Sequence, residues 1–252
     1  MTEDKLSIKS YASVDETATR TRLKSLLDQC PIPSEQLLAN LGLFLESKNL
    51  ARILAMDFLF RQIVDVPGVV MELGTRWGQN LALFAALRGI YEPFNRHRTI
   101  VGFDTFSGFP SISRQDGSSE MMQPGQLAVT ADYARYLEEI IACHELVNPL
   151  SHLSKHSLRI GDSARELARY FEEAPHTVVA LAYFDFDLYA PTKACLELIR
   201  PRLTRGSVVA FDEVNDPDSP GETIALMETF GLGQVRLRRF RHASRMSYFV
   251  VE

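Results

Sequence analysis

The sequence has few cysteines and no long apolar run. Its three cysteines, Cys30, Cys143 and Cys195, are scattered and form no C-x-x-C pair, which argues against a structural zinc site and fits a reducing, cytoplasmic setting. No apolar segment approaches the ~20 residues that a membrane-spanning helix needs. The opening MTEDKLSIKS lacks the apolar stretch of a secretory signal. We therefore expect a cytoplasmic protein with no membrane partner.

A basic excess is also missing. Lysine and arginine number 27 against 32 acidic residues, and the formal net charge is -5, so we expect no nucleic-acid partner. There is no internal repeat and no low-complexity segment. The remaining composition is that of a globular protein, with 46% hydrophobic and 23% charged residues in a chain of 252. That length is enough for one domain with a sizeable core.

The pattern of apolar residues divides the chain in two. Residues 15–64 show helical spacing, which predicts an N-terminal helical extension over residues 1–64. From residue 65 to 252, strand-like and helix-like segments alternate, which predicts a parallel sheet covered by helices on both faces. The seven strand-like runs are GVVMEL (68–73), RTIVGFD (98–104), HSLRIGD (156–162), TVVALAYFDFD (177–187), GSVVAFDE (206–213), QVRLRRF (234–240) and RMSYFVV (245–251).

The last two runs break the alternation. Only RHAS (241–244) joins them, which is too short for a crossover helix, so these strands must pair antiparallel. We predict an α/β fold with a mostly parallel, seven-stranded sheet, an antiparallel last strand and additional N-terminal helices.

Acidic residues close the first five of these runs. In open parallel sheets, ligands bind beyond the carboxyl ends of the strands, so these ends are the predicted site. A single acidic end would be explained as a turn or a helix cap, but five together indicate a functional edge. The segments are MELGTRWGQN (71–80), GFDTFSGFP (102–110), RIGDSARE (159–166), YFDFDLYAPT (183–192) and AFDEVND (210–216).

The first of these segments contains a glycine turn. Gly74 and Gly78 permit a tight turn and a close approach of the backbone to a ligand. The G-x-G-x-x-G fingerprint of dinucleotide sites is absent, which favours a nucleoside without phosphates, such as S-adenosylmethionine. Asp104 follows some thirty residues later, where an acidic residue accepts hydrogen bonds from ribose hydroxyls. The alternative for Asp104 is an Asx-turn, and we favour the ribose role.

The next segment, GDSA, opens a helix. Asp162 and Ser163 are predicted to cap that helix in any case. They could also contact an adenine amino group, but capping is the safer interpretation.

The last two segments bring several carboxylates together. Asp185 and Asp187 are separated by one residue and share a face if they lie on a strand, and like charges so close call for a cation. Asp212 and Glu213 end the neighbouring strand. We therefore predict that Asp187, Asp212 and Glu213 bind Mg²⁺ or another hard divalent ion. The alternative is that Asp187 and Asp212 cap helices and face water.

Together these motifs resemble the macrocin-type (TylF/MycF) sugar O-methyltransferases of natural-product pathways, which are metal-dependent class I enzymes that use S-adenosylmethionine. The resemblance covers roughly residues 40–215 and rests on VPGVVMELGTRWGQN, GFDTFSGFP, GDSA, DFDLYAPT and FDEVN. It implies a class I methyltransferase fold and a small-molecule acceptor, with homo-oligomers common in the family. It also implies a cofactor site formed by Glu72, Gly74, Arg76, Gly78, Asn80, Asp104, Ser107, Asp162, Ser163 and Asp185.

The resemblance further implies that Asp187, besides binding the metal with Asp212 and Glu213, is the catalytic base. Three features depart from the family pattern. The turn reads GTRWG, with tryptophan and arginine exchanged; the last metal ligand is a glutamate; and the segment after Asp104 contains no histidine. The missing histidine argues against a histidine-assisted mechanism and leaves proton transfer to Asp187.

The segment from Ser107 to Thr130 is long, polar and rich in Gly and Pro, and we interpret it as a lid over the acceptor. Met121 and Met122 within it either contact the substrate or simply pack. The leading hypothesis is a Mg²⁺-dependent O-methyltransferase acting on a small, sugar-containing natural product. The alternatives are an N-methyltransferase of the same fold, a subunit that binds S-adenosylmethionine without turnover, and a metal-dependent hydroxylase or hydrolase.

Two further motifs are given non-catalytic interpretations. HELVNPLSHLSKH (144–156) is not H-E-x-x-H, because Asn148 stands where the second histidine should be, so His152 and His156 are predicted to be surface residues. The basic run RLRRFRHASR (236–245) is predicted to be an edge strand protected by charge. A minority hypothesis assigns Arg238 to the diphosphate of a nucleotide-linked substrate.

Overall fold

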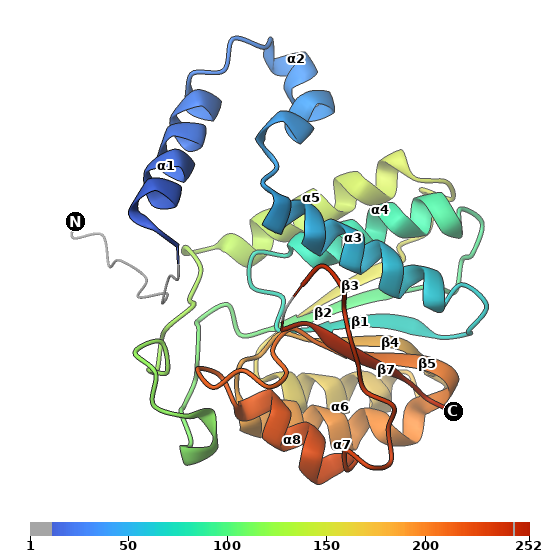
Figure 1. The fold of residues 1–252 in the computed structure, drawn as a ribbon. Helices are drawn as coiled ribbons and strands as arrows, with labels where there is room; N and C mark the ends of the chain where they lie inside the picture. The colour runs from blue at the N-terminus through green and yellow to red at the C-terminus, as the bar shows by residue number, and fades with distance from the viewer. Residues whose placement is uncertain (1–11, 244) are drawn as a thin grey trace.

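The computed structural model describes residues 12–243 and 245–252 and confirms the alternation of strands and helices (Figure 1). The strands are β1 (Val69–Leu73), β2 (Ile100–Asp104), β3 (His156–Ile160), β4 (Val179–Phe184), β5 (Leu203–Phe211), β6 (Arg238–Arg239) and β7 (Ser247–Val250). The helices before the sheet are α1 (Val14–Asp28), α2 (Ser34–Leu37), the 3₁₀ helix η1 (Leu38–Phe44) and α3 (Ser47–Gln62). The later helices are α4 (Gln79–Tyr91), η2 (Arg114–Asp116), α5 (Tyr133–Val147), α6 (Ser163–Glu173), α7 (Tyr189–Ile199), η3 (Arg200–Arg202) and α8 (Gly221–Thr229).

The seven strands form one sheet in the order β3-β2-β1-β4-β5-β7-β6. The first five of these strands are parallel to one another. β7 runs antiparallel to β5, and β6 runs antiparallel to β7. The predicted mixed sheet is therefore confirmed. The predicted strand over residues 234–240 is shorter than expected, since only Arg238 and Arg239 pair with β7.

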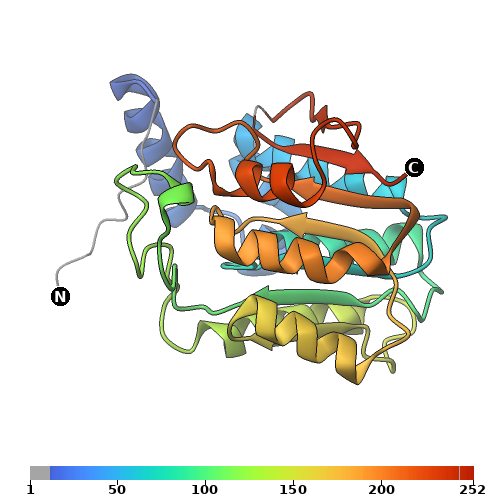
Figure 2. The same cartoon turned by 90° about the horizontal axis from the view of Figure 1, so that it is seen from below.

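Helices cover both faces of the sheet, as Figures 1 and 2 show. α3, α4 and α5 lie on one face, and α6, α7 and α8 lie on the other. Neighbouring residues of a strand enter opposite cores: Val70 packs with Phe60 and Phe84, whereas Met71 packs with Phe171 among the residues under the second layer. The central strands, such as β1 and β4, read as nearly continuous apolar runs because both of their faces are buried.

The helices before the sheet fall into two parts. α1, α2 and η1 contain no buried residue among those described, and they project from the body as an arm (Figure 1); we call residues 14–44 the N-terminal arm. α3, in contrast, buries Met56, Leu59 and Phe60 against the sheet layer. The structural break thus lies before α3, inside the extension predicted for residues 1–64.

The carboxyl ends of the parallel strands meet at one edge of the sheet. Leu73 at the end of β1 pairs with Phe103 of β2 and with Phe184 of β4, and Phe184 in turn pairs with Phe211 of β5. The strand order reverses between β1 and β4, which is where open α/β sheets have their ligand crevice. Among the described residues no helix has the length and apolarity needed to cross a membrane. All three cysteines are free thiols.

Candidate active site

A cavity of about 370 Å³ opens at this edge of the sheet. The loops after β1, β2, β3, β4 and β5 all contribute to its wall, together with Lys48 and Arg52 of α3 and with Arg245. Among the predicted residues, the wall contains Glu72, Gly74, Arg76, Gly78, Asn80, Asp104, Asp162, Ser163, Asp185, Asp187, Asp212 and Glu213. Ser107 is exposed and lies outside the wall, so the structure does not support its predicted contact with the cofactor.

The glycine turn packs directly on the loop that follows β4. Gly74 has φ +98°, and a Cβ added to it would lie 2.1 Å from the carbonyl oxygen of Asp185. Such a distance excludes any side chain at this position, since real Cβ contacts are always longer. Position 74 therefore requires glycine both for its backbone conformation and for this contact.

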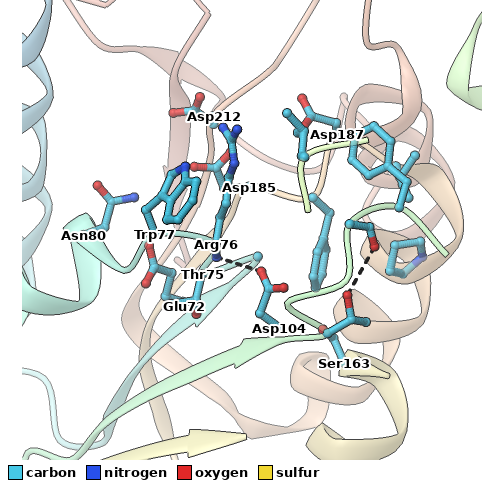
Figure 3. A pocket seen from close by; sticks show the side chains of 18 of the residues that line it. Glu72, Thr75, Arg76, Trp77, Asn80, Asp104, Ser163, Asp185, Asp187 and Asp212 are labelled. Carbon is cyan, nitrogen blue, oxygen red and sulfur yellow. Dashed lines mark hydrogen bonds between the residues drawn. The ribbon is translucent and has the colours of Figure 1, made fainter. Parts of the chain in front are cut away.

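Asp104 ties the end of β2 to the same turn. Its Oδ2 accepts a hydrogen bond from the backbone N–H of Arg76 at 2.7 Å (Figure 3). Its Oδ1 accepts one from the backbone N–H of Phe106 at 2.6 Å. The bond to Phe106 is the Asx-turn that the sequence offered as an alternative. Burial raises the pKa of Asp104, although both backbone donors favour the ionised form. Each carboxylate oxygen has a second lone pair, so this turn is compatible with a ribose contact.

Three residues in the loops that surround the cavity have strained backbones. Arg76, Phe106 and Asp187 have φ values of 47°, 56° and 60°, which are uncommon for residues other than glycine. Each such residue costs on the order of 1–3 kcal/mol and persists only where its surroundings enforce it. They lie in the loops after β1, β2 and β4, so the strain is shared among the loops that form the site.

Two buried polar residues face the cavity from the β1–α4 region. Glu72 on β1 and Asn80 on α4 are almost fully buried, and burial raises the pKa of Glu72 well above its usual range. In the described structure, Glu72 Oε2 and Asn80 Oδ1 lack hydrogen-bond partners. Buried polar atoms are normally satisfied, so these two acceptors indicate a site for a ligand that donates hydrogen bonds.

The start of α6 agrees with the capping prediction. Asp162 is the N-cap and accepts a hydrogen bond from the backbone N–H of Arg165 at 2.9 Å. Ser163 is the first residue of the helix and is buried. Both residues line the cavity, so the predicted contact with adenine stays open beside the observed cap.

Trp77 is the single tryptophan of the chain and lines the cavity next to the glycine turn. Its ring meets that of Tyr133 edge to face at a centroid distance of 4.8 Å, and the Tyr133 hydroxyl donates to the Trp77 carbonyl at 2.9 Å. The side chain is held in place yet 41% of it is exposed. Its fluorescence is therefore a direct reporter of ligands in this cavity.

Three carboxylates converge in the same cavity. β4 ends at Phe184, so Asp185 and Asp187 lie in the following loop and not on the strand itself. One oxygen each of Asp185, Asp187 and Glu213 lies within 4.8 Å of the others. Burial and the neighbouring Asp212 raise the pKa of Asp187 to about 6. Burial and Asp187 raise the pKa of Glu213 well above its usual range.

This cluster fits a hard divalent cation. All of its donor atoms are carboxylate oxygens, the ligands that Mg²⁺ prefers and zinc does not. Glu213 Oε2 is buried without a partner among the described residues, so an acceptor is available. A divalent ion would also relieve the repulsion that raises the pKa values of Asp187 and Glu213.

Asp212, predicted to be a metal ligand, is hydrogen-bonded to other protein side chains in this structure. Both of its oxygens accept hydrogen bonds from Arg52 Nη2 at 2.8 Å, and the Tyr183 hydroxyl donates to Oδ1. Burial opposes ionisation, yet the charge of Arg52 holds the pKa of Asp212 below its ordinary value. Removing one partner of a buried ion pair destabilises a protein by roughly 3–5 kcal/mol. The pair between Asp212 and Arg52 is therefore expected to be kept. The three carboxylates whose oxygens converge thus include Asp185, and the metal-ligand role of Asp212 stays a prediction.

Two arginines that the sequence analysis did not single out complete this end of the site. Arg52 also contacts Asp185, at 3.2 Å, and Arg245 contacts Glu213 and Asp216, each at 2.9 Å. In the sequence, Arg52 cannot be told apart from other basic residues on amphipathic helices. Its contacts with Asp185 and Asp212 arise only because α3 packs against the sheet beside the cavity. Arg245 was read as part of the basic edge run. No local pattern in the sequence marks either residue.

The predicted lid, residues 107–130, forms part of the wall. Phe109 and Met122 are buried against Leu188 in a small separate core. Met122 therefore packs, whereas Met121 lines the cavity. Buried Asp116 accepts hydrogen bonds from Ser113 and from the backbone N–H of Tyr189 at the start of α7, which fastens the segment beside Asp187.

Apart from Arg245, the described residues of the basic run do not line the cavity. β6 is an exposed edge strand, which agrees with the charged-edge prediction. Arg238 lines a separate groove between α3 and β6, so it does not support the minority hypothesis of a diphosphate contact in the active site. His152 is exposed, whereas His156 is partly buried beside Glu145.

Comparison with known proteins places the chain among methyltransferases. No protein-family model and no curated protein matches it. A crystal structure of CalS11, the calicheamicin methyltransferase, is 47% identical with a TM-score of 0.93 and covers 96% of this chain and 94% of its own. An apo structure of CalS11, a TDP-rhamnose 3'-O-methyltransferase of calicheamicin biosynthesis, is 45% identical with a TM-score of 0.85 and covers 96% of both chains.

A more distant structure, the O-methyltransferase NovP, is 18% identical with a TM-score of 0.60 over 80% of each chain and shares the fold. The identity to CalS11 extends over nearly the whole of both chains. The chain therefore belongs to the CalS11 family of class I S-adenosylmethionine-dependent O-methyltransferases of natural-product biosynthesis.

Proposed function

We propose that this methyltransferase acts on a hydroxyl of a small, sugar-containing acceptor and depends on a divalent cation such as Mg²⁺. The observation that carries the proposal is that one cavity contains both the glycine turn with Asp104 and the trio Asp185, Asp187 and Glu213. A cofactor seated at one end would present its methyl group toward the carboxylates at the other. Holding the two reactants together in this way supplies much of the rate of a displacement reaction.

The chain's own residues divide the cofactor-binding work. Asp104 is proposed to accept hydrogen bonds from the ribose hydroxyls, and the turn from Gly74 to Gly78 to approach the methionine part. Asp162 and Ser163 lie where the adenine would end. The unpartnered acceptors on Glu72 and Asn80 suit the ammonium group of the cofactor, which donates hydrogen bonds and carries a positive charge.

Asp185, Asp187 and Glu213 would hold the cation, which would lower the pKa of an acceptor hydroxyl and orient it. Asp187 is proposed to take the hydroxyl proton. The oxygen then forms its bond to the methyl carbon as the carbon–sulfur bond breaks, and the electron pair of that bond stays on sulfur. The products are the methyl ether and S-adenosylhomocysteine. Arg52 and Arg245 hold Asp185 and Glu213 in place through ion pairs.

The acceptor class is a nucleotide-linked sugar. CalS11 is a TDP-rhamnose 3'-O-methyltransferase, and its identity to this chain supports the same class here. Lys48 adds support, because it lines the cavity from the first turn of α3 and has no ion pair among the described residues. A free cation at the cavity wall suits an anionic diphosphate.

Metal removal tests the proposal. S-adenosylmethionine is titrated while Trp77 fluorescence is followed, with Mg²⁺ and again with EDTA, and turnover of a nucleotide-linked sugar is measured by mass spectrometry. We expect binding in both conditions. Turnover should fall about 1,000-fold in EDTA, because metal polarisation contributes several kcal/mol, and should return with added Mg²⁺. Undiminished turnover in EDTA would refute the metal dependence, and methylation of amines alone would favour the N-methyltransferase alternative.

We also infer that copies of the chain associate through the N-terminal arm. Leu26, Leu38 and Leu43 on the arm are 53%, 80% and 66% exposed, and exposed apolar patches of this kind mark contact surfaces. Light scattering after size exclusion should give a multiple of the monomer mass, and the double substitution Leu38→Glu with Leu43→Glu should reduce it. A wild type that stays monomeric at high concentration would disprove the association.

A further inference from the structure

Glu222 is a fully buried carboxylate that the sequence analysis did not single out. It is the second residue of α8 and is 0% exposed. A helix start stabilises a nearby negative charge, but Glu222 does not cap its own helix. Its hydrogen-bond donors are backbone N–H groups of two other segments. A buried carboxylate used in this way needs a reason, since burying its charge is unfavourable.

The two oxygens of Glu222 bridge two loops of the active site. Oε1 accepts a hydrogen bond from the N–H of Phe186 at 2.8 Å and from that of Asp187 at 3.3 Å, and Oε2 accepts one from the N–H of Glu213 at 3.3 Å. The first loop follows β4 and carries Asp185 and Asp187; the second follows β5 and carries Glu213. These are the three converging carboxylates.

The start of α8 is packed too tightly to shift. A Cβ added to Gly221 would lie 2.5 Å from the backbone nitrogen of Tyr189 and 2.8 Å from the Asp187 carbonyl oxygen. Asp116 of the lid segment also packs against Gly221, because its Oδ1 would lie 2.8 Å from the same added Cβ. This Oδ1 accepts a hydrogen bond from the backbone N–H of Tyr189. Glu222 therefore projects from a fixed point.

The loop that Glu222 holds needs external support. Asp187 has φ +60°, a conformation that a residue other than glycine keeps only when its surroundings enforce it. The hydrogen bonds from Phe186 and Asp187 to Glu222 act at this strained residue. Gly74, which touches the Asp185 carbonyl, supports the other end of the same loop.

We propose that Glu222 is a positioning residue for the carboxylate trio: it fixes the separation of the loops that carry Asp187 and Glu213 and thereby sets the affinity for the divalent cation. This inference rests on the proposed metal site. Glutamine cannot take over the bridge, because it has one acceptor oxygen and its NH₂ group would face a backbone N–H.

Manganese titration of Glu222→Gln tests the proposal, with Mn²⁺ binding followed by electron paramagnetic resonance and S-adenosylmethionine binding followed by Trp77 fluorescence. We expect the Kd for Mn²⁺ to rise about 10- to 100-fold, as for other residues that support metal ligands, while the cofactor Kd stays unchanged. Glu228→Gln is the matched control, since Glu228 lies on the same helix, is exposed and pairs with Lys193 at 2.6 Å. This control should bind Mn²⁺ like the wild type.

The outcomes separate the two proposals. If the wild type binds no Mn²⁺, the proposed metal site fails. If the wild type binds Mn²⁺ and Glu222→Gln binds it equally well, the metal site stands and the role of Glu222 is overturned. An equal loss of cofactor affinity would also overturn it, because that result indicates a general structural role. Should the variant not fold, amide exchange in the wild type decides: the N–H groups of Phe186 and Asp187 must be protected, and exchange at the rate of free amides rejects the bridge.

Discussion

Asp187→Asn is expected to lower kcat by about 1,000-fold, within the range for losing a general base, while leaving the affinity for S-adenosylmethionine close to that of the wild type. The amide keeps the size of the side chain but cannot take the acceptor proton, and it removes one negative charge from the trio. Single-turnover methyl transfer measures the first effect, and Trp77 fluorescence measures the second.

Asp65→Asn provides the control for this substitution, because Asp65 is exposed and lies outside the cavity wall. It should leave both quantities unchanged. A wild-type kcat in Asp187→Asn would remove Asp187 from the chemistry. A large loss of cofactor affinity together with kcat would instead indicate that the loop after β4 had collapsed.

Gly74→Ala is expected to lower the free energy of unfolding by about 3 kcal/mol and to weaken cofactor binding about tenfold or more. The new methyl group would meet the Asp185 carbonyl at 2.1 Å in a backbone with φ +98°. Either the turn or the loop after β4 must move. Chemical denaturation measures the first change and cofactor titration the second.

Gly125→Ala separates the two causes of that loss. Gly125 also has positive φ, +82°, but an added Cβ there meets nothing within 4 Å. It should therefore show only the backbone strain, on the order of 1 kcal/mol, with normal cofactor binding. If Gly74→Ala behaved no worse than Gly125→Ala, the contact between the turn and Asp185 would not matter.

Much of the fold followed from the sequence because the central strands, such as β1 and β4, are buried on both faces. Continuous apolar runs such as VVAF of β5 and helical spacing in α4 and α6 are local signals. The short RHAS connection was enough to predict the antiparallel pairing of β6 and β7, and the structure confirms it. The length of β6 was overestimated, since an alternating charged segment marks an exposed edge but does not say how many residues pair with the next strand.

The sequence does not determine which of the carboxylates converge, for a geometric reason. The sequence places Asp185, Asp187, Asp212 and Glu213 at one edge, but it does not say where β4 ends. Because the strand stops at Phe184, the loop can turn, and Asp185 joins Asp187 and Glu213. Asp212 is hydrogen-bonded to Arg52, which is 160 positions away in the chain. Glu222 was missed for the same reason, since its partners are backbone groups that no sequence pattern reveals.

The contact between Gly74 and the Asp185 carbonyl has a thermodynamic consequence. The backbone of the glycine turn at Gly74 packs on the backbone of the loop that carries Asp185 and Asp187. A movement of one segment therefore shifts the other. Any factor by which a bound cation changes the affinity for S-adenosylmethionine must equal the factor by which S-adenosylmethionine changes the affinity for the cation. The two proposed ligands of this cavity would thus be linked through the absence of a side chain at position 74.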